Sequence, residues 1–319
     1  MLWKITDRKN ALRIGTIAIV VIAIISLSQN LLQGANPIEK MEHRRVLVRS
    51  VDCTAFDHLS KLFREKGYVV YRPVNLSEEI LNGAEAFTAK IKGKRIQDAW
   101  TTDEHVKNLA MHPEILNLLE CLHGKAVFPF QTLNFPEGTE QPIHSDIVHF
   151  DTLPTRGLMT AAWVALEDIY PDSGPLIYYP GSHLQGLWDY DQLGMRTDFA
   201  HRYKLEDYGP YETLLSKAID ASGLKPHHAK LRRGEIFVWA ASLLHGGGPI
   251  TNRTRTRRSQ VTHYYLEGAQ FYTVPRLSNF NKYDQIQFKS ELPRCLETNC
   301  VRQYLKMFKN NGFKSNFSY

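Results

Sequence analysis

Apolar residues recur with three different spacings, and each spacing occupies its own part of the chain. Near the amino terminus, residues 14–32 are almost continuously apolar. Between residues 54 and 122, apolar positions recur every three or four residues, as on amphipathic helices. From residue 126 to residue 266, short β-branched and aromatic runs are separated by Pro, Gly and Asp, which is typical of strands and turns.

The region with the three-to-four-residue spacing predicts three helices. In the first, four apolar residues fall on one face, and a glycine at position 67 is suited to end the helix. The other two predicted helices show the same period. The helices cover residues 54–66, 77–91 and 103–122, and a strand over residues 68–74 separates the first two.

The β-rich region predicts a double-sheet barrel or sandwich, because several short strands follow one another without a long helix between them. Residues 184–229 form a long insertion without clear strands, which is typical of a lid or binding loop. The fold class is therefore mainly β with flanking helices (α+β). The predicted strands cover residues 127–135, 158–166, 176–179, 231–239 and 260–266.

The apolar stretch at the amino terminus predicts a transmembrane helix, since residues 14–32 just reach the length that spans a bilayer. A cleaved signal peptide is the alternative, because basic residues precede the stretch and Ser26-Leu27-Ser28 resembles a cleavage site. We favour an uncleaved, single-pass anchor because the charged leader is long. Basic residues lie on both sides of the span, so the side of the membrane stays open.

The apolar and polar patterns divide the chain into four predicted segments. One of them is a single catalytic domain, as expected for a chain of 319 residues. Gly, Asn and Pro after the span indicate a juxtamembrane linker. The predicted parts are a basic leader and anchor over residues 1–33, the linker over 34–50, the domain over 51–275 and a basic extension over 276–319.

Composition narrows the class of protein. A hydrophobic content of 43% excludes a disordered chain. The net charge of +6 is compatible with an anionic substrate, a membrane surface or nucleic acid. We expect no nucleic-acid partner, because no basic helix with interleaved aromatic residues is present.

The cysteines and the glycosylation sequons do not indicate in which cellular compartment the chain resides. Four cysteines are too few and too irregularly spaced for a disulfide framework, so free thiols are predicted, although the last two could pair. The redox compartment stays open. Three sequons occur at a frequency expected by chance, and the second lies too close to the proposed site to be a good acceptor. The cysteines are Cys53, Cys121, Cys295 and Cys300, and the sequons begin at Asn75, Asn252 and Asn316.

Candidate chemistry begins at Gln141-Pro-Ile-His-Ser-Asp146. His144 and Asp146 are two residues apart, so on an extended chain both side chains point to one face. An imidazole and a carboxylate side by side are two adjacent ligands for a divalent metal. The motif is short, and His149-Phe-Asp151 repeats it in a segment that we interpret as structural.

The third metal ligand that we predict is His245, which follows an apolar run predicted as a buried strand. Two histidines and one carboxylate on one face of an octahedron are diagnostic of Fe(II) oxygenases. The remaining positions would take a 2-oxo acid and dioxygen. Arginine suits the distal carboxylate of 2-oxoglutarate, and Arg257 is the predicted residue. Its rivals are Arg253, Arg255 and Arg258.

Several ordered motifs together resemble the phytanoyl-CoA dioxygenase family over roughly residues 54–268. They are Phe135-Pro-Glu-Gly138 before the metal pair, Ala162-Trp-Val-Ala-Leu-Glu-Asp168, Ser173-Gly-Pro-Leu176, Pro180-Gly-Ser-His183, Arg233-Gly-Glu235, and His245 followed by Arg257-Arg258.

The resemblance implies a double-stranded β-helix, or jelly roll, with iron at its mouth. It implies that His144, Asp146 and His245 ligate Fe(II) and that Arg257 binds 2-oxoglutarate, with Gln131 and Trp163 lining the pocket. It also favours hydroxylation, because relatives that halogenate carry a small residue at the position of Asp146. The family's acyl-CoA substrate is not implied.

The chain departs from the family at two points. Many relatives carry a serine two residues after the second histidine, where this chain has Gly247, and one extra residue separates His245 from the arginine. Both departures concern the binding of the co-substrate.

We therefore predict an Fe(II)- and 2-oxoglutarate-dependent dioxygenase that hydroxylates a small organic or lipid-like substrate and releases succinate and CO2. Two alternatives stay open. One is a catalytically inactive jelly-roll binding module anchored to a membrane, which would bind iron but no co-substrate. The other is a cupin-like zinc hydrolase, in which three protein ligands leave a position for water.

Overall fold

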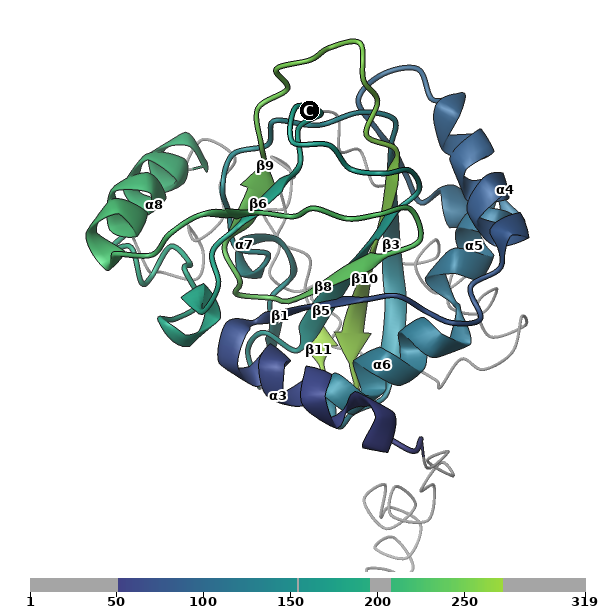
Figure 1. Cartoon of the computed structure of the whole chain (residues 1–319). Helices are drawn as coiled ribbons and strands as arrows, with labels where there is room; N and C mark the ends of the chain where they lie inside the picture. The colour runs from purple at the N-terminus through teal and green to yellow at the C-terminus, as the bar shows by residue number, and fades with distance from the viewer. Residues whose placement is uncertain (1–50, 154, 196–207, 272–319) are drawn as a thin grey trace, which may run out of the picture. The chain divides into compact units, whose positions relative to one another are not determined.

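The computed structural model describes residues 51–153, 155–195 and 208–271 (Figure 1). The predicted anchor, linker and carboxyl-terminal extension lie outside the described residues, as do Cys295 and Cys300. Within the described ranges, no helix combines the length and the apolar character that crossing a bilayer requires.

An antiparallel six-stranded sheet forms the centre of the described domain, with strand order β1-β8-β5-β10-β3-β2. Strands that are far apart in the sequence are neighbours in this sheet: β1 pairs with β8, and β3 and β5 both pair with β10. The strands are β1 Tyr68–Tyr71, β8 Ile236–Ala240, β5 Met159–Ala165, β10 Ser259–Leu266, β3 Val127–Phe135 and β2 Ile96–Gln97.

A smaller sheet of order β7-β6-β9 faces the large one. Tyr178 of the small sheet lies in one buried cluster with Trp163 and Phe237 of the large sheet. The mainly β core with flanking helices confirms the predicted fold class. The small sheet consists of β7 His227–His228, β6 Leu176–Tyr178 and β9 His245–Gly247, and a separate pair joins β4 Thr152–Leu153 to β11 Gln270–Phe271.

Strand β8 is apolar at every position and β5 at all but Thr160, because both faces of these central strands are covered. Along β5, Ala161 and Trp163 point between the sheets, whereas Ala162 and Val164 point to the helices on the other face. Strand β8 alternates in the same way. This two-residue period fixes the strand register, because a shift by one residue would exchange the two faces.

Helices cover the outer face of the large sheet, and Figure 1 shows α3 to α6 along that side. Ser77 caps α4 through a hydrogen bond from Ile80 N, and Gly67 ends α3 in the left-handed conformation. The helices are η1 Thr54–Phe56, α3 Asp57–Lys66, α4 Glu78–Ala89, η2 Ala99–Thr101, α5 Glu104–Ala110 and α6 Pro113–His123.

Two of the predicted elements are wrong in their bounds. The helix predicted over residues 103–122 is two helices, because Pro113 has no N–H to donate and takes the first position of a new helix. The strand predicted over residues 231–239 begins only at Ile236, because a turn with Gly234 at φ +83° precedes it.

The insertion over residues 184–229 is not a bare loop in its described part. Helix α8, Tyr208–Ser222, buries Tyr211 and Leu215 against Leu244, which immediately precedes His245. The sequence interpretation missed this helix. The insertion is therefore packed against the segment that carries the candidate metal ligand. Two further short helices complete the described part, α7 Ile147–Phe150 and η3 Ser182–Leu184.

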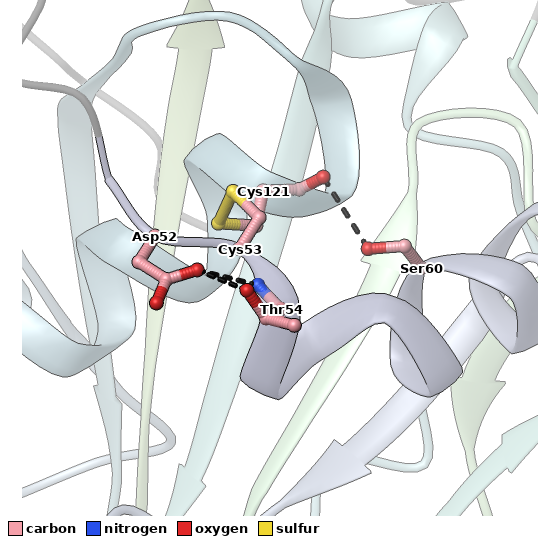
Figure 2. Close-up of a disulfide and its surroundings, with 5 residues drawn as sticks. All are labelled: Asp52, Cys53, Thr54, Ser60 and Cys121. Atoms are coloured by element: carbon pink, nitrogen blue, oxygen red, sulfur yellow. Dashed lines mark hydrogen bonds between the residues drawn. A yellow bond between two sulfur atoms is a disulfide. The ribbon is translucent and has the colours of Figure 1, made fainter.

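Cys53 and Cys121 form a disulfide, which corrects the prediction that both are free thiols (Figure 2). The two residues are 68 positions apart, with Cα atoms 5.4 Å apart. The bond joins the start of the first helical segment to α6, beside a hydrogen bond from Ser60 Oγ to Cys121 O of 3.3 Å. Sequence spacing could not reveal this pair, because tertiary packing of α3 against α6 brings it together.

We expect Cys53→Ser to lower the free energy of unfolding by about 4 kcal/mol, the loop-closure contribution for a loop of this length. Urea denaturation of the purified domain measures the change. Cys121→Ser and the double variant should reach the same stability, because each removes the same cross-link. Equal stability of the wild type with and without reductant would contradict a structural role for the bond.

Candidate metal centre

The candidate metal ligands meet where the small sheet reaches the loop after β3. His144 pairs with His245 as an antiparallel bridge, with His144 N donating to His245 O at 2.9 Å and His245 N donating to His144 O at 3.1 Å. Residues 101 positions apart in the sequence are thus backbone neighbours. The structure brings together the three residues that the sequence nominated.

The three side chains form a compact, buried cluster. Oδ1 of Asp146 lies 3.8 Å from Nε2 of His144 and 3.8 Å from Nε2 of His245. All three candidate ligand atoms lie within 4.8 Å of one another. Two neighbouring ligand atoms that each bind one cation at about 2.1 Å lie roughly 3 Å apart. The three side chains therefore need only a small inward movement to bind a cation.

Backbone carbonyls orient both imidazole rings. Nδ1 of His144 lies 2.9 Å from Pro142 O, and Nδ1 of His245 lies 2.9 Å from Leu243 O. A carbonyl only accepts, so each Nδ1 carries the proton and each Nε2 keeps its lone pair for the cluster. Burial lowers the pKa of His245 to about 4, which keeps this ring neutral and able to ligate at neutral pH.

The carboxylate of Asp146 is held by a residue that the sequence interpretation missed. Trp239 Nε1 donates to Asp146 Oδ2 at 2.8 Å, and both residues are buried. The hydrogen bond occupies one oxygen and leaves Oδ1 toward the histidines. Its sequence signal is the alternation in β8, which places Trp239 on the same inward face as Phe237.

The insertion also fixes the turn between the first two ligands. Ser145 Oγ donates to Leu187 O at 2.7 Å, and Ser145 N donates to the hydroxyl of Tyr211 on α8 at 3.4 Å. His144 and Asp146 therefore point to the cluster while the residue between them is anchored on the opposite side.

Glycine is required at the two positions after His245. A Cβ on Gly246 would lie 2.7 Å from Gln141 O, and a Cβ on Gly247 would lie 2.7 Å from the backbone nitrogens of Glu140 and Gln141. It would also lie 2.8 Å from the hydroxyl of Thr139. This close approach explains why Gly247 stands where many relatives carry serine: the neighbouring loop occupies that space.

Of the four nominated arginines, Arg257 alone lines the pocket at the cluster. It is 4% exposed, and its guanidinium carbon lies 5.2 Å from the ring centre of Trp163. Nη2 donates to Glu137 O at 3.3 Å, but Nε is buried without a hydrogen-bond partner in the part of the chain that the structure describes. Burial lowers the pKa of Arg257 to about 10, and Glu167 opposes this shift.

The three rival arginines are already paired with carboxylates outside the pocket. Arg253 lies 3.3 Å from Glu140 and its side chain is 72% exposed. The other two make equivalent pairs. Arg255 lies 3.1 Å from Asp172, and Arg258 lies 3.1 Å from Glu167 and 3.3 Å from Glu85.

Gln131 and Trp163, the two weaker candidates, are both buried and both line the pocket. His149 lines it as well, although the sequence interpretation treated its segment as structural. His263 was missed altogether. It is buried on β10, six residues after Arg257, and its Nδ1 has no hydrogen-bond partner within the described ranges. Positions two residues apart on β10 share a face, and this alternation could have revealed it.

A family model described as phytanoyl-CoA dioxygenase matches residues 63–259. The chain belongs to this family. A mouse member, "Phytanoyl-CoA dioxygenase, peroxisomal", is 25% identical over 207 residues, which are 62% of this chain and 55% of the mouse protein. The chain thus spans little more than half the length of that relative.

Solved structures that resemble this family member share its fold. The non-haem α-ketoglutarate-dependent carbocyclase SnoK from nogalamycin biosynthesis superposes with a TM-score of 0.56 at 18% identity, over 69% of this chain and 88% of SnoK. The epimerase SnoN, in complex with Fe3+, α-ketoglutarate and nogalamycin RO, gives a TM-score of 0.52 at 22% identity, over 70% of this chain and 88% of SnoN.

We expect Trp239→Phe to weaken divalent metal binding by about 10- to 100-fold, because Asp146 Oδ2 loses its buried donor and the carboxylate is no longer held in place. Calorimetric titration with Mn(II) in the absence of 2-oxoglutarate measures the affinity. Trp163→Phe is the matched control, since Trp163 is an equally buried indole of the same cluster. Equal affinities in the two variants would show that the hydrogen bond does not support the site.

Proposed function

We propose that this chain is an Fe(II)- and 2-oxoglutarate-dependent dioxygenase that hydroxylates a small organic or lipid-like substrate. The observation that carries the proposal is one pocket that holds both a buried His-Asp-His cluster and a buried arginine that, among the described residues, has no carboxylate partner at bonding distance. A binding module or a hydrolase would have no use for the second feature.

The donor set suits Fe(II). Two neutral imidazole nitrogens and one carboxylate oxygen on one side of a pocket are the facial arrangement of non-haem iron oxygenases. His144, Asp146 and His245 would hold the ion. A bound metal would couple two reactions: the decarboxylation of 2-oxoglutarate to succinate and CO2, and the hydroxylation of the substrate by dioxygen.

Arg257 binds the distal carboxylate of 2-oxoglutarate in this proposal. A guanidinium buried without a counter-charge is costly, and a carboxylate that pairs with it recovers that cost. The aromatic ring of Trp163 beside the guanidinium excludes water from the pair. Because the proximal end of the co-substrate must reach the metal, Arg257 and the cluster together set the orientation of the molecule.

Thr139 supplies the hydroxyl that Gly247 lacks. It lines the same pocket, and its Oγ1 occupies the space next to the missing side chain of Gly247. Oγ1 accepts a hydrogen bond from Gln141 N at 3.3 Å, so its own proton is free to be donated to a carboxylate. The loop from Thr139 to Gln141 thus replaces the serine of relatives in position and in chemistry.

The remaining wall of the pocket is suited to an organic substrate. The ring centroids of Phe150 and His263 lie 5.0 Å apart, and those of His149 and Phe150 lie 5.8 Å apart. All three rings line the pocket. Aromatic walls hold apolar surface, and ring nitrogens orient polar groups. Asp146 occupies the position that would otherwise admit a halide, which supports hydroxylation.

We also propose that residues 14–32 anchor the enzyme to a membrane as a single span. The length and apolar character of that sequence support the proposal. An anchor would place the pocket close to membrane-associated substrates.

Turnover is the first test. Purified, iron-loaded protein should convert 2-oxoglutarate to succinate in air, and Asp146→Ala should reduce succinate formation at least 100-fold because one metal ligand is lost. Mass spectrometry of succinate measures the reaction. Zinc-supported hydrolysis without succinate would favour the hydrolase alternative, and stoichiometric iron binding without 2-oxoglutarate binding would favour the inactive module.

Arg257→Lys should raise the apparent Kd for 2-oxoglutarate by about 10- to 100-fold, because a lysine cannot form the bidentate pair with a carboxylate. Calorimetry with Mn(II)-loaded protein, without oxygen, separates this binding from turnover. Arg253→Lys is the matched control and should leave the Kd unchanged. A larger effect at Arg253 would show that the wrong arginine has been assigned.

Thr139→Val should weaken 2-oxoglutarate binding several-fold, whereas Thr139→Ser should keep the wild-type affinity, since it retains the hydroxyl. The same anaerobic calorimetry measures both variants. If valine and serine behave alike, the hydroxyl has no part in co-substrate binding.

A further inference from the structure

The disulfide between Cys53 and Cys121 carries information about where the domain folds. Disulfides persist in oxidising compartments and are kept reduced in the cytosol by glutathione and thioredoxin. Both cysteines are only half-buried, so a cytosolic reductant could reach them. A bond at this position therefore requires an environment that keeps it closed.

The bond is structural and has no place in the chemistry of the pocket. Neither cysteine is among the residues that line it. Within the described ranges there is no free cysteine that could exchange with the pair. A redox-active disulfide needs an attacking thiol and an accessible partner, whereas this one ties the first helical segment to α6.

A second observation concerns the sequon Asn75-Leu76-Ser77. Asn75 is exposed in the loop between β1 and α4, on the helical side of the domain. Its Nδ2 donates to Oε1 of the half-buried Glu114 at 2.5 Å. Sequons accept glycans in exposed loops of proteins that enter the secretory pathway.

The sequon at Asn252 differs, because its side chain is engaged at both ends. Nδ2 donates to Asp172 Oδ2 at 3.2 Å, and Oδ1 accepts from Thr254 N at 3.1 Å and from Thr254 Oγ1 at 2.7 Å. Asn252 is half-buried in this turn. The structure therefore separates two sequons that are equivalent in sequence.

We propose that the domain described here folds on the oxidising, non-cytosolic side of a membrane, where Cys53 and Cys121 join and Asn75 accepts an N-linked glycan. This assignment selects one orientation for the span predicted over residues 14–32: the basic leader is cytosolic and the chain after the span is lumenal. The charges flanking that span leave the choice open. The proposal is independent of the oxygenase activity.

The test uses the full chain expressed in cultured animal cells. Thiols are blocked with N-ethylmaleimide during lysis, and cysteines that become reactive only after reduction are then labelled with a mass-tagged maleimide. A Cys295→Ser/Cys300→Ser background confines the label to the pair. We expect two labels after reduction and none before it. Two thiols already blocked at lysis, in protein that is folded, would overturn the proposal.

Glycan removal tests the same orientation by a separate readout. In an Asn316→Gln background, which removes the sequon outside the described residues, peptide N-glycosidase should increase the gel mobility of the parent protein and of Asn252→Gln, and it should leave Asn75→Gln unchanged. In sealed microsomes the domain should resist added protease until detergent is present. Digestion without detergent would place the domain in the cytosol and overturn the proposal, and an unglycosylated wild type would overturn the assignment of Asn75.

These readouts do not depend on iron or 2-oxoglutarate. His144→Ala should show the same thiol pattern, glycan and protease resistance as the wild type. A failure of the oxygenase proposal and a failure of the compartment proposal are thus distinguishable in the same set of cells.

Discussion

The backbone bridge between His144 and His245 is the interaction on which the rest of the site depends. The bridge joins the loop after β3 to β9 of the small sheet and sets the two imidazoles side by side. Oδ1 of Asp146 then lies 3.8 Å from Nε2 of each histidine. The bridge forms only because Gly246 and Gly247 let the two segments approach without side chains. The choice of glycine in β9 is therefore a requirement of the metal centre, and the hydroxyl of Thr139 lies 2.8 Å from where a side chain on Gly247 would begin.

The arginines after β9 differ in whether a carboxylate lies beside them. Four arginines after β9 lie within residues 253–258, and three of them are paired with nearby carboxylates. Arg257 is turned inward, buried beside Trp163, and keeps an unpartnered Nε. In the proposed function, this buried cation and the metal ligands, which line one pocket, bind the two ends of a small dicarboxylate.

Short-range patterns were sufficient for most of the fold and for the residues of the metal cluster. Short β-branched and aromatic runs predicted β3 and β10, and the two-residue spacing of His144 and Asp146 predicted that both point to one face. What could not be predicted depends on contacts distant in sequence: Trp239 reaches a carboxylate 93 positions away, and Cys53 meets Cys121 only because two helices pack. Pro113 is the sequence signal for the break between α5 and α6, and the prediction of one helix over residues 103–122 did not use it.

A crystal structure of the protein, grown without oxygen with Mn(II) and 2-oxoglutarate, is the most direct test of the metal centre. We predict one anomalous peak bonded to Nε2 of His144, Oδ1 of Asp146 and Nε2 of His245, with the far carboxylate of the co-substrate on Arg257. A metal held by other residues, or a co-substrate carboxylate directed away from Arg257, would contradict it.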